Sequence, residues 1–580
     1  MHAGQRTVQR DKSWREIEEA APQFMAAAPA PAPASKKRQL TTDGSSKRWR
    51  GQMNAVVVAL VMAMLPVVVF ITGRRPAVWI QTAADGLRRG SDAFFLHPRL
   101  LGGLLLDGFD QETCHSRYQS AMYRRNSGRQ PSSYLISKLR RQEALQRRCG
   151  PGTAAYRNAV EQLRSGESVA SPECKYIVSI SYCGLGNRIL AAASAFLYAV
   201  LTDRVVLIDP SNDMDELFCE PFPGTTWLMP RDFPVAGYTN FSVDSAESYG
   251  NMVKNRVVRN DGAGVSTAPP PALVYVHLNN DYTDHDRLFY CDEDQRLLRR
   301  VQWLVMRTNS YIVPGLFLLA GFREELGKLF PEPDAVFHHL GRYLFHPNNL
   351  VWGLVTRYYE AYLSTAQKRV GIQVRVFGAD SNSPELVEQI TTCTQKNSLL
   401  PEVLGAGSSE PMTLPASGRR NSTAVLVTSL KSWYYERIRS MYWENAAAAG
   451  GGGGAVSVHQ PSHEEYQHFG AKSHDAKAWA EIYLLSLTDE LVTTGKSTFG
   501  YVAQGLAGVR PWVMQKPWNR LADQPCWRDV SMEPCFHRPP YYDCQLKRWA
   551  DPGKVVPHVQ HCGDVSWGLK TVNREGDPLP

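Results

Sequence analysis

The stretch YIVSISYCGLGNRILAAASAFLYAVLTDRVVLID, residues 176–209, decides the fold class of this chain. Residues 176–180 are predicted to form a short apolar strand, and the Ala- and Leu-rich residues 189–201 a helix. Residues 205–209 are predicted to form the next strand. Strand, helix and strand with short connections predict a parallel sheet that is covered on both faces.

The turn between the first strand and the helix, residues 184–188, is a candidate anion site. Gly184 and Gly186 let the backbone approach a ligand closely, and the helix N-terminus offers backbone N–H groups to a negative charge. Arg188 adds a forked and permanent positive charge. An ordinary tight connection between a strand and a helix explains the same glycines, so the turn alone leaves the function open.

The alternation of strands and helices recurs toward the C-terminus. Strands are predicted over residues 370–376, 424–429, 455–458 and 490–494, with helices over 383–393, 434–443 and 477–487. We therefore predict an α/β chain with two doubly wound, Rossmann-like domains and a ligand in the cleft beyond the carboxyl ends of their strands.

The expected boundaries follow from this pattern. Residues 132–148 should form an exposed amphipathic helix, and the run AAAAGGGGG at 446–454 a surface loop. We place the N-terminal, acceptor-side domain at 99–365, the nucleotide-binding domain at 366–510, and a Cys-rich segment that packs on the body at 511–580.

An uncharged stretch, AVVVALVMAMLPVVVFIT at residues 55–72, precedes both domains. Its length is about the minimum that crosses a hydrocarbon core of roughly 30 Å. Basic residues are more frequent before it than directly after it, so residues 1–54 are expected to form a disordered cytosolic tail. Residues 73–98 are expected to form a stem. This layout predicts a single-pass type II membrane protein whose larger part faces a lumen.

The cysteines and glycosylation sequons agree with a luminal location. All 11 cysteines follow the apolar stretch, as expected in an oxidising compartment, and the odd count leaves at least one thiol unpaired or shared between chains. The sequons at Asn240 and Asn421 are candidate glycosylation sites. Golgi glycosyltransferases and some receptors share this layout. The mild net charge of +8 does not indicate a nucleic-acid surface.

A transferase that uses a sugar nucleotide must neutralise a departing diphosphate, either with a metal held by carboxylates or with cationic side chains and helix N-termini. Three D-x-D patterns are candidate metal sites, although surface acids produce the same pattern: 213–215, 284–286 and 292–294. The metal-free route is better supported, because the turn at 184–188 can meet an anion and Arg375 lies inside a predicted strand that is otherwise apolar. A buried guanidinium needs a phosphate or an acidic partner such as an interdomain salt bridge.

Several long strings resemble the plant xyloglucan fucosyltransferase family. The resemblance covers about residues 100–570. The strings are LLGGLL (100–105), SYCGLGNRIL (181–190), HHLGRYLFHP (338–347), VWGLVTRYYEAYL (351–363), GIQVRVF (371–377), AVLVTSL (424–430), STFGYVAQGLAG (497–508), SMEPCFH (531–537) and HCGDVSWGLK (561–570).

The resemblance implies a variant of the two-domain GT-B fold behind a single N-terminal transmembrane helix. It also implies an inverting transfer of L-fucose from GDP-fucose to the 2-hydroxyl of a terminal galactose on xyloglucan, with no cofactor or essential metal. Arg375 matches the arginine on the donor pyrophosphate, and Asn187 and Arg188 match positions lining the cleft. Ser497, Thr498 and Phe499 match the third donor motif, although by themselves they would indicate only a helix N-cap.

The general base is the least defined part of the site. Candidates are Asp281, Asp284, Asp286 and Asp564, of which we place Asp564 first. The resemblance implies an acidic residue near Asn309, where this sequence has an amide, which is a poor base.

Three alternatives remain open at this point. The same donor could serve an arabinogalactan-protein acceptor, a metal-dependent transferase could use another nucleotide sugar, or the chain could be a silent Golgi protein that binds glycans or scaffolds other enzymes. We expect a Golgi membrane location, and a homodimer or a complex with other Golgi transferases.

Overall fold

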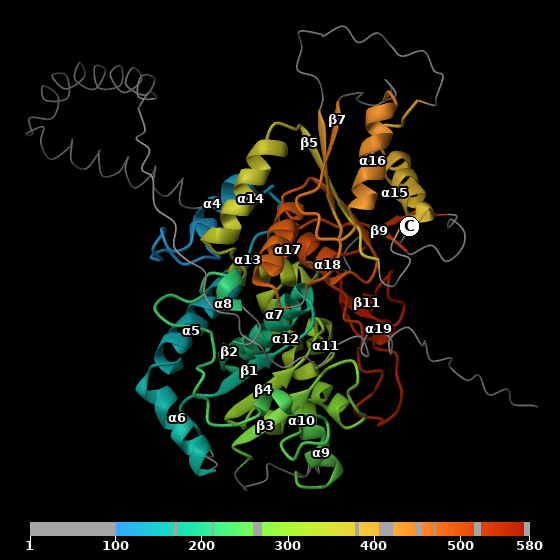
Figure 1. Ribbon diagram of the computed structural model, residues 1–580. Coiled ribbons are helices and arrows are strands. Elements are labelled where there is room, and N and C mark those ends of the chain that lie inside the picture. Colours follow the sequence, from blue (N-terminus) through green and yellow to red (C-terminus); the bar gives the residue numbers. More distant parts are fainter. Residues whose placement is uncertain are drawn as a thin grey trace, which may run out of the picture. The chain divides into compact units, whose positions relative to one another are not determined.

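The computed structural model describes residues 100–166, 171–210, 214–258, 270–376, 382–404, 422–447, 455–468, 470–515 and 524–573 (Figure 1). The predicted tail, membrane anchor and stem lie outside these residues, as do Asn421 and most of the Ala/Gly run. Within the described part, two parallel sheets confirm the α/β class.

The first sheet has four strands in the order β2-β1-β4-β3, all parallel. The strands are β1 (Tyr176–Ile180), β2 (Val205–Ile208), β3 (Leu273–His277) and β4 (Trp303–Arg307). Every residue of β1 is buried, because both faces of the sheet are covered and the strand is apolar throughout.

Helix α7 (Leu185–Thr202) joins β1 to β2 and starts earlier than the sequence suggested. Gly184 is its N-cap, and the Gly184 carbonyl accepts the backbone N–H groups of Asn187 and Arg188 at 2.9 and 3.2 Å. The prediction that residues 184–188 form a turn was therefore wrong: Asn187 and Arg188 lie in the first helical turn. Among the described helices, α7 alone is long and apolar enough to span a membrane, but 89% of it is buried in the core.

The second sheet has six strands in the order β10-β9-β8-β5-β6-β7, parallel except for β10. They are β5 (Lys368–Gln373), β6 (Thr423–Thr428), β7 (Val456–His459), β8 (Glu490–Thr494), β9 (Trp512–Met514) and β10 (Trp527–Arg528). Strand β5 ends at Gln373, so Arg375 lies just beyond the strand and not inside it, as residues 370–376 had been predicted.

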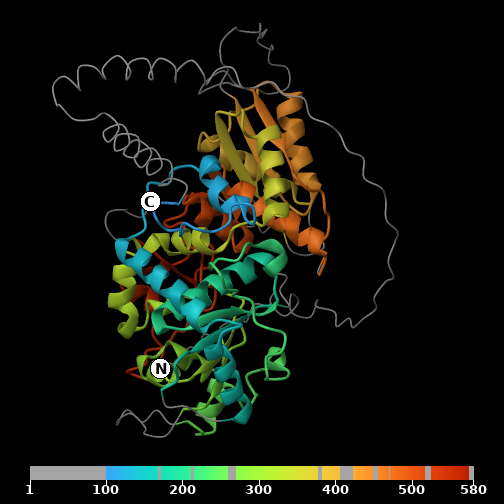
Figure 2. The ribbon, with the colours of Figure 1, turned by 90° about the vertical axis from the view of Figure 1, so that its left-hand side faces the viewer.

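Four helices alternate with the strands of the second sheet: α15 (Pro384–Lys396), α16 (Ser432–Glu444), α17 (Lys472–Leu485) and α18 (Thr498–Ala507). Helices α15 and α16 pack against each other, while α17 and α18 contact α7 of the first sheet. In Figures 1 and 2 the two sheets occupy separate halves of the described region, and Figure 1 shows α13 (Val336–Leu344), α17 and α18 between them.

The remaining described elements surround the two sheets. They are α4 (His115–Tyr123), α5 (Ser133–Cys149), α6 (Ala154–Ser165), α8 (Met214–Leu217), α9 (Tyr249–Lys254), α10 (Asp292–Leu298), α11 (Val313–Leu316), α12 (Ala320–Leu329), α13 (Val336–Leu344), α14 (Asn349–Tyr362), α19 (Pro552–Val555) and the hairpin β11 (Val559–His561)–β12 (Leu569–Thr571). Helix α5 matches the predicted amphipathic helix and buries one face, including Leu135 and Leu139.

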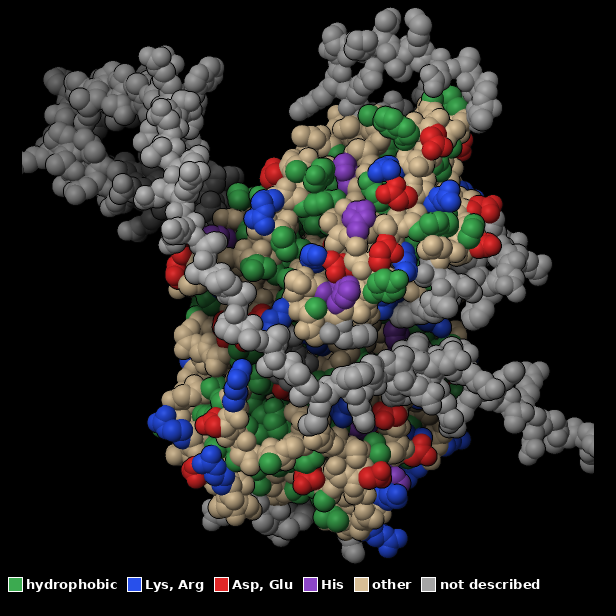
Figure 3. Space-filling model, viewed as in Figure 1, with side chains coloured by type: hydrophobic (Ala, Val, Ile, Leu, Met, Phe, Trp, Pro, Cys, Tyr) green, Lys and Arg blue, Asp and Glu red, His purple; other side chains and the backbone are tan. Residues whose placement is uncertain are grey.

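The largest hydrophobic cluster joins the two halves. It contains Ile189 and Phe196 of α7, Phe337 of α13, and Trp479 and Leu506 of α17 and α18. Two sheets with separate strand orders therefore share one continuous core. On the described residues of the face in Figure 3, Lys and Arg side chains are interspersed with Asp and Glu.

Five disulfides use ten of the 11 cysteines. The pairs are Cys114–Cys219, Cys149–Cys174, Cys291–Cys544, Cys393–Cys526 and Cys535–Cys562. Cys183 is exposed and takes part in none of them, which accounts for the odd count. Three of the five pairs involve the C-terminal segment 524–573, so this segment is covalently attached to the rest of the fold.

Candidate functional site

Loops at the carboxyl ends of both sheets meet through a chain of polar contacts. The Asn187 amide donates to the carbonyl of Asn309 at 2.8 Å, and the Thr498 hydroxyl donates to the Asn187 side-chain oxygen at 3.0 Å. The Ser181 hydroxyl donates to the Asn309 side chain at 2.8 Å. Residues predicted from separate motifs, 187 and 498, are thus in direct contact although 311 positions apart.

The two glycines of the α7 turn serve different purposes. A Cβ atom on Gly186 would lie 2.7 Å from the Thr498 hydroxyl and 2.8 Å from its carbonyl carbon. A Cβ atom on Gly184 would meet only Gln467, at 3.7 Å. Gly186 therefore allows the N-termini of α7 and α18 to approach closely, so that both present backbone N–H groups to the same region.

Arg375 lies at the carboxyl end of β5, beside this region. Its backbone N–H donates to the Thr494 hydroxyl at 2.9 Å, and its guanidinium donates to the Gln467 side chain at 3.0 Å. Gln467 also faces Gly184, so Arg375 and the start of α7 share a neighbour. Burial lowers the pKa of the Arg375 guanidinium, because its charge is partly removed from water. A bound phosphate would compensate that charge.

Arg188 forms a salt bridge with Asp475 in the first turn of α17, and both side chains are largely buried. The predicted donor-binding arginine therefore has an anionic partner in this structure and holds α7 against α17. Asp475 was not among the predicted site residues. An acidic residue in a first helical turn is common, since it favours the helix dipole, so its role could not be recognised from the local pattern.

The third predicted donor motif forms the start of α18. Ser497 is its N-cap and accepts the backbone N–H of Gly500 at 3.4 Å, so its hydroxyl has a capping role. Thr498 makes the contact with Asn187, and Phe499 packs against the large hydrophobic cluster. Of the three residues, Thr498 is the one that the structure connects to the α7 turn.

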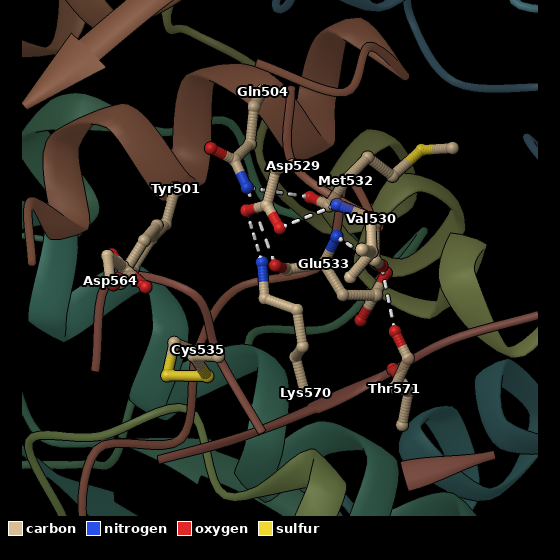
Figure 4. A network of polar contacts seen from close by, with 12 residues as sticks. Tyr501, Gln504, Asp529, Val530, Met532, Glu533, Cys535, Asp564, Lys570 and Thr571 are labelled. Carbon is tan, nitrogen blue, oxygen red and sulfur yellow. Dashed lines mark hydrogen bonds and ion pairs between the residues drawn. A yellow bond between two sulfur atoms is a disulfide. The ribbon is translucent and has the colours of Figure 1, made fainter. Parts of the chain in front are cut away.

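Asp564 lies beside Tyr501 of α18 (Figure 4) and contacts residues 496–498, the donor loop between β8 and α18, through the Lys496 backbone. It is 8% exposed. One of its carboxylate oxygens accepts the Tyr501 hydroxyl and the Lys496 backbone N–H, the latter at 2.8 Å. A general base must reach the proton that it removes. The structure instead gives Asp564 the position of a residue that holds the loop between β8 and α18.

The contacts of Asp564 belong to a buried polar network that the sequence analysis missed (Figure 4). Lys570 and Asp529 form a buried salt bridge at 2.5 Å, and Gln504 of α18 donates to the carbonyl of Met532 at 3.2 Å. Both links tie the C-terminal segment to itself and to α18. In the sequence, the motif SMEPCFH (531–537) indicated a functional role for this segment only because it resembles the plant xyloglucan fucosyltransferase family.

Among the carboxyl groups of this network, Glu533 has the largest shift in pKa. It accepts the Tyr311 hydroxyl at 2.6 Å and the Phe337 backbone N–H at 2.7 Å. Its complete burial raises the carboxyl pKa to about 8, since the charged form loses its hydration. Tyr311 follows Asn309 by two residues in the loop after β4. Its hydrogen bond to Glu533 therefore holds this loop in place.

The three acidic residues around position 284 separate into different roles. Asp286 is buried and accepts the backbone N–H and hydroxyl of Thr283, so it stabilises a turn. Asp284 pairs with Arg287 at 2.9 Å. Asp281 has a side chain that is 58% exposed and forms a 2.7 Å contact with His277 at the end of β3. That hydrogen bond lowers the pKa of the Asp281 carboxyl.

Two of the three D-x-D patterns, 284–286 and 292–294, have structural partners. Asp292 accepts the backbone N–H groups of Ala320 and Gly321 at 3.0 and 2.8 Å, and Asp294 accepts the Tyr249 hydroxyl. Asp213 lies outside the described residues. Within the described ranges, one group of possible metal ligands lies within 4.8 Å: Cys535, Cys562 and Asp564. The two cysteines form a disulfide, so this group does not suit a metal ion.

Comparison with known proteins identifies the family. Residues 77–545 match the family described as xyloglucan fucosyltransferase. The galactoside 2-alpha-L-fucosyltransferase of Pisum sativum is 52% identical over 491 residues, covering 83% of this chain and 84% of that protein. The protein of the same name from Arabidopsis thaliana is 54% identical over 481 residues, covering 82% and 83%.

A solved structure agrees with this comparison. The structure of a point mutant of Arabidopsis thaliana FUT1 in complex with GDP has a TM-score of 0.75 and 52% sequence identity, and the match covers 82% of this chain and 100% of that one. The family match spans most of this chain, and the relatives are matched over more than four fifths of their length. The chain therefore belongs to the xyloglucan fucosyltransferase family.

Proposed function

We propose that the chain transfers L-fucose from GDP-fucose to the 2-hydroxyl of a terminal galactose on xyloglucan, with inversion, for cell-wall biogenesis. The observation that carries the proposal is the meeting of the α7 and α18 N-termini beside Arg375, at the carboxyl ends of two parallel sheets. The names of the close relatives support the donor sugar and the galactoside acceptor.

The arrangement suits the departure of GDP. In the transfer, the bond from the fucose anomeric carbon to the diphosphate oxygen breaks while a bond to the galactose oxygen forms. The diphosphate gains negative charge, which two helix N-termini and the Arg375 guanidinium would stabilise. Their partly buried setting strengthens this effect, because water screens the charges less.

The galactose hydroxyl must lose a proton as it attacks. Asp281 suits this step better than Asp564, because its side chain is 58% exposed and a substrate hydroxyl or a water molecule can reach it. It follows β3, beside the strand that leads to Asn309. We assign the proton to Asp281, directly or through a water molecule.

The fold, the cellular location and the lack of a cofactor belong to the same proposal. Two parallel sheets that face one site support a variant of the GT-B fold. Five disulfides and an exposed Asn240 support the lumen of the Golgi, behind a membrane anchor at residues 55–72. The structural roles of Asp292 and Asp294 support transfer without a metal ion.

The test is GDP release by the full-length chain purified in detergent. The chain receives GDP-fucose, EDTA and galactosylated, unfucosylated xyloglucan. Arg375→Ala should abolish release, whereas Arg164→Ala, which removes an exposed arginine of α6, should leave it unchanged.

Each other outcome selects an alternative. Release with an arabinogalactan acceptor alone would keep the donor and replace the acceptor. Release that EDTA stops would indicate a metal-dependent enzyme. A folded chain that binds GDP and releases none with either acceptor would indicate a glycan-binding or scaffold protein.

A further inference from the structure

A cavity that has no role in the steps above lies beside Lys496, in the loop between β8 and α18. It has a volume of about 300 Å³ and is formed by residues 282–287 and the C-terminal segment. Aromatic rings make up much of its wall, with charged side chains between them: Tyr282, Tyr541, Trp549 and Trp567 with Asp284, Arg287 and Arg538. We call this cavity the aromatic pocket.

The composition of the aromatic pocket suits a neutral sugar. Trp549 is 70% exposed and Trp567 40%, so both offer ring surface to a ligand. The C–H groups of one pyranose face pack on a flat aromatic ring, which sheds water from both surfaces. The hydroxyl groups at the edge of the sugar need donors and acceptors, which the Arg287–Asp284 pair supplies.

The walls of the aromatic pocket are fixed before a ligand arrives. The Cys291–Cys544 disulfide ties its C-terminal wall to the start of α10. The Tyr541 hydroxyl donates to the Trp567 carbonyl at 2.7 Å, and the Tyr541 and Trp549 rings stack with centroids 5.9 Å apart. Exposed aromatic rings held in place lose little entropy on binding, which favours a built binding site over an incidental surface patch.

The aromatic pocket adjoins the donor loop through Lys496. The ammonium group of Lys496 lies 5.0 Å from the centre of the Trp567 ring, while its backbone N–H is held by Asp564. Ser497 and Thr498 follow directly in the chain. A sugar in the pocket would therefore lie near the fucose acceptor site, within reach of the same polysaccharide.

We infer that the aromatic pocket is an acceptor subsite that binds a sugar residue of the polysaccharide other than the galactose that is fucosylated. This inference rests on the proposed function and names a site that recognises the surrounding glycan. Its consequence is selectivity: long xyloglucan would bind through two sites, whereas an isolated galactoside would occupy the reaction site alone.

The test is Trp549→Ala in the full-length chain. It should raise the KM for polymeric xyloglucan about tenfold, which equals about 1.4 kcal/mol, with a much smaller change in kcat and in the KM for GDP-fucose. The KM for a small β-galactoside should move by less than about twofold. Trp443→Ala is the matched control, because Trp443 is 86% exposed on α16, away from the pocket.

A binding measurement separates failure of the inference from failure of the proposed function. Galactose-free xylosylated glucan oligosaccharides cannot be fucosylated. They should bind to the unmodified chain and to the Trp443→Ala variant with higher affinity than to the Trp549→Ala variant. Equal binding and equal xyloglucan KM in the two variants would overturn the inference. Absence of transfer by the unmodified chain, with Trp549-dependent binding intact, would overturn the proposed function and keep the subsite.

Discussion

Replacing Gly186 by alanine tests the close approach of the two helix N-termini. The added Cβ would lie 2.8 Å from the carbonyl carbon of Thr498, whereas ordinary contacts begin at 3.4 Å. The two segments would therefore have to separate by about 0.6 Å, the difference between those distances. The atoms in the way include backbone, so a change of side-chain rotamer cannot remove the clash.

The expected loss follows from that displacement. Overpacking of this kind costs about 1–3 kcal/mol of stability. A misplacement of about 1 Å at a catalytic site can lower activity about a hundredfold. For Gly186→Ala we therefore expect kcat/KM for GDP-fucose to fall about 10- to 100-fold, which is about 1.4–2.7 kcal/mol of transition-state stabilisation.

The assay compares Gly186→Ala with Gly184→Ala, its neighbour in the same turn. The Cβ of Gly184→Ala would meet only Gln467 at 3.7 Å, and the φ of −53° at Gly184 is open to alanine. Initial rates with xyloglucan, calorimetric GDP affinity and thermal unfolding are measured for both variants. If folded Gly186→Ala keeps a kcat/KM within about twofold of that of Gly184→Ala, the close approach of the α7 and α18 N-termini is not required for transfer.

Three further predictions concern carboxyl groups. Glu533 has its pKa raised by burial to about 8, so the free energy of unfolding should fall as pH rises from the ordinary Glu pKa of 4.5 to about 8, by at most about 1.4 kcal/mol per pH unit. Glu533→Gln should flatten this fall in thermal unfolding between pH 5 and 8, and parallel curves would contradict the burial effect. Asp564→Ala should raise the KM for GDP-fucose and lower kcat, because the Lys496 backbone loses its hydrogen bond to the carboxylate. Asp564→Asn keeps an acceptor oxygen, so its KM and kcat should be close to those of the unmodified chain. Recovery of neither by Asp564→Asn, with GDP affinity intact, would instead restore Asp564 as the base. Asp281→Asn should lower kcat at least about tenfold with GDP affinity unchanged, and unaltered kcat would remove Asp281 from the mechanism.

The sequence predicted six of the ten strands in the two sheets, because these strands are short runs bounded by turn residues, whereas β3, β4, β9 and β10 were not predicted. Strands β1 and β8 lie where they were predicted, at residues 176–180 and 490–494. Helix α7 begins at Leu185, four residues before the predicted start at 189, because two glycines in this stretch resemble a turn. Gly184 is in fact the N-cap, and Gly186 is needed inside the helix for its contact with Thr498.

The motifs also predicted which segments meet at the site, but not what each side chain does there. Arg188 is bound by Asp475, which lies 287 positions away, and Tyr311 by Glu533, 222 positions away. No local pattern carries such pairings, because they arise only when distant segments pack. The burial of Asp564 could not be recognised for the same reason.

Two disulfides end in the same C-terminal segment and restrict how the fold can move. Cys291–Cys544 attaches the segment beside the first sheet, and Cys393–Cys526 attaches it beside the second. The two halves therefore cannot swing apart on that side unless the segment between Cys526 and Cys544 unfolds as well. Substrate entry must then use hinge motion on the opposite side or small rearrangements of loops. Reduction of these two disulfides would let the two halves of the fold separate further on that side.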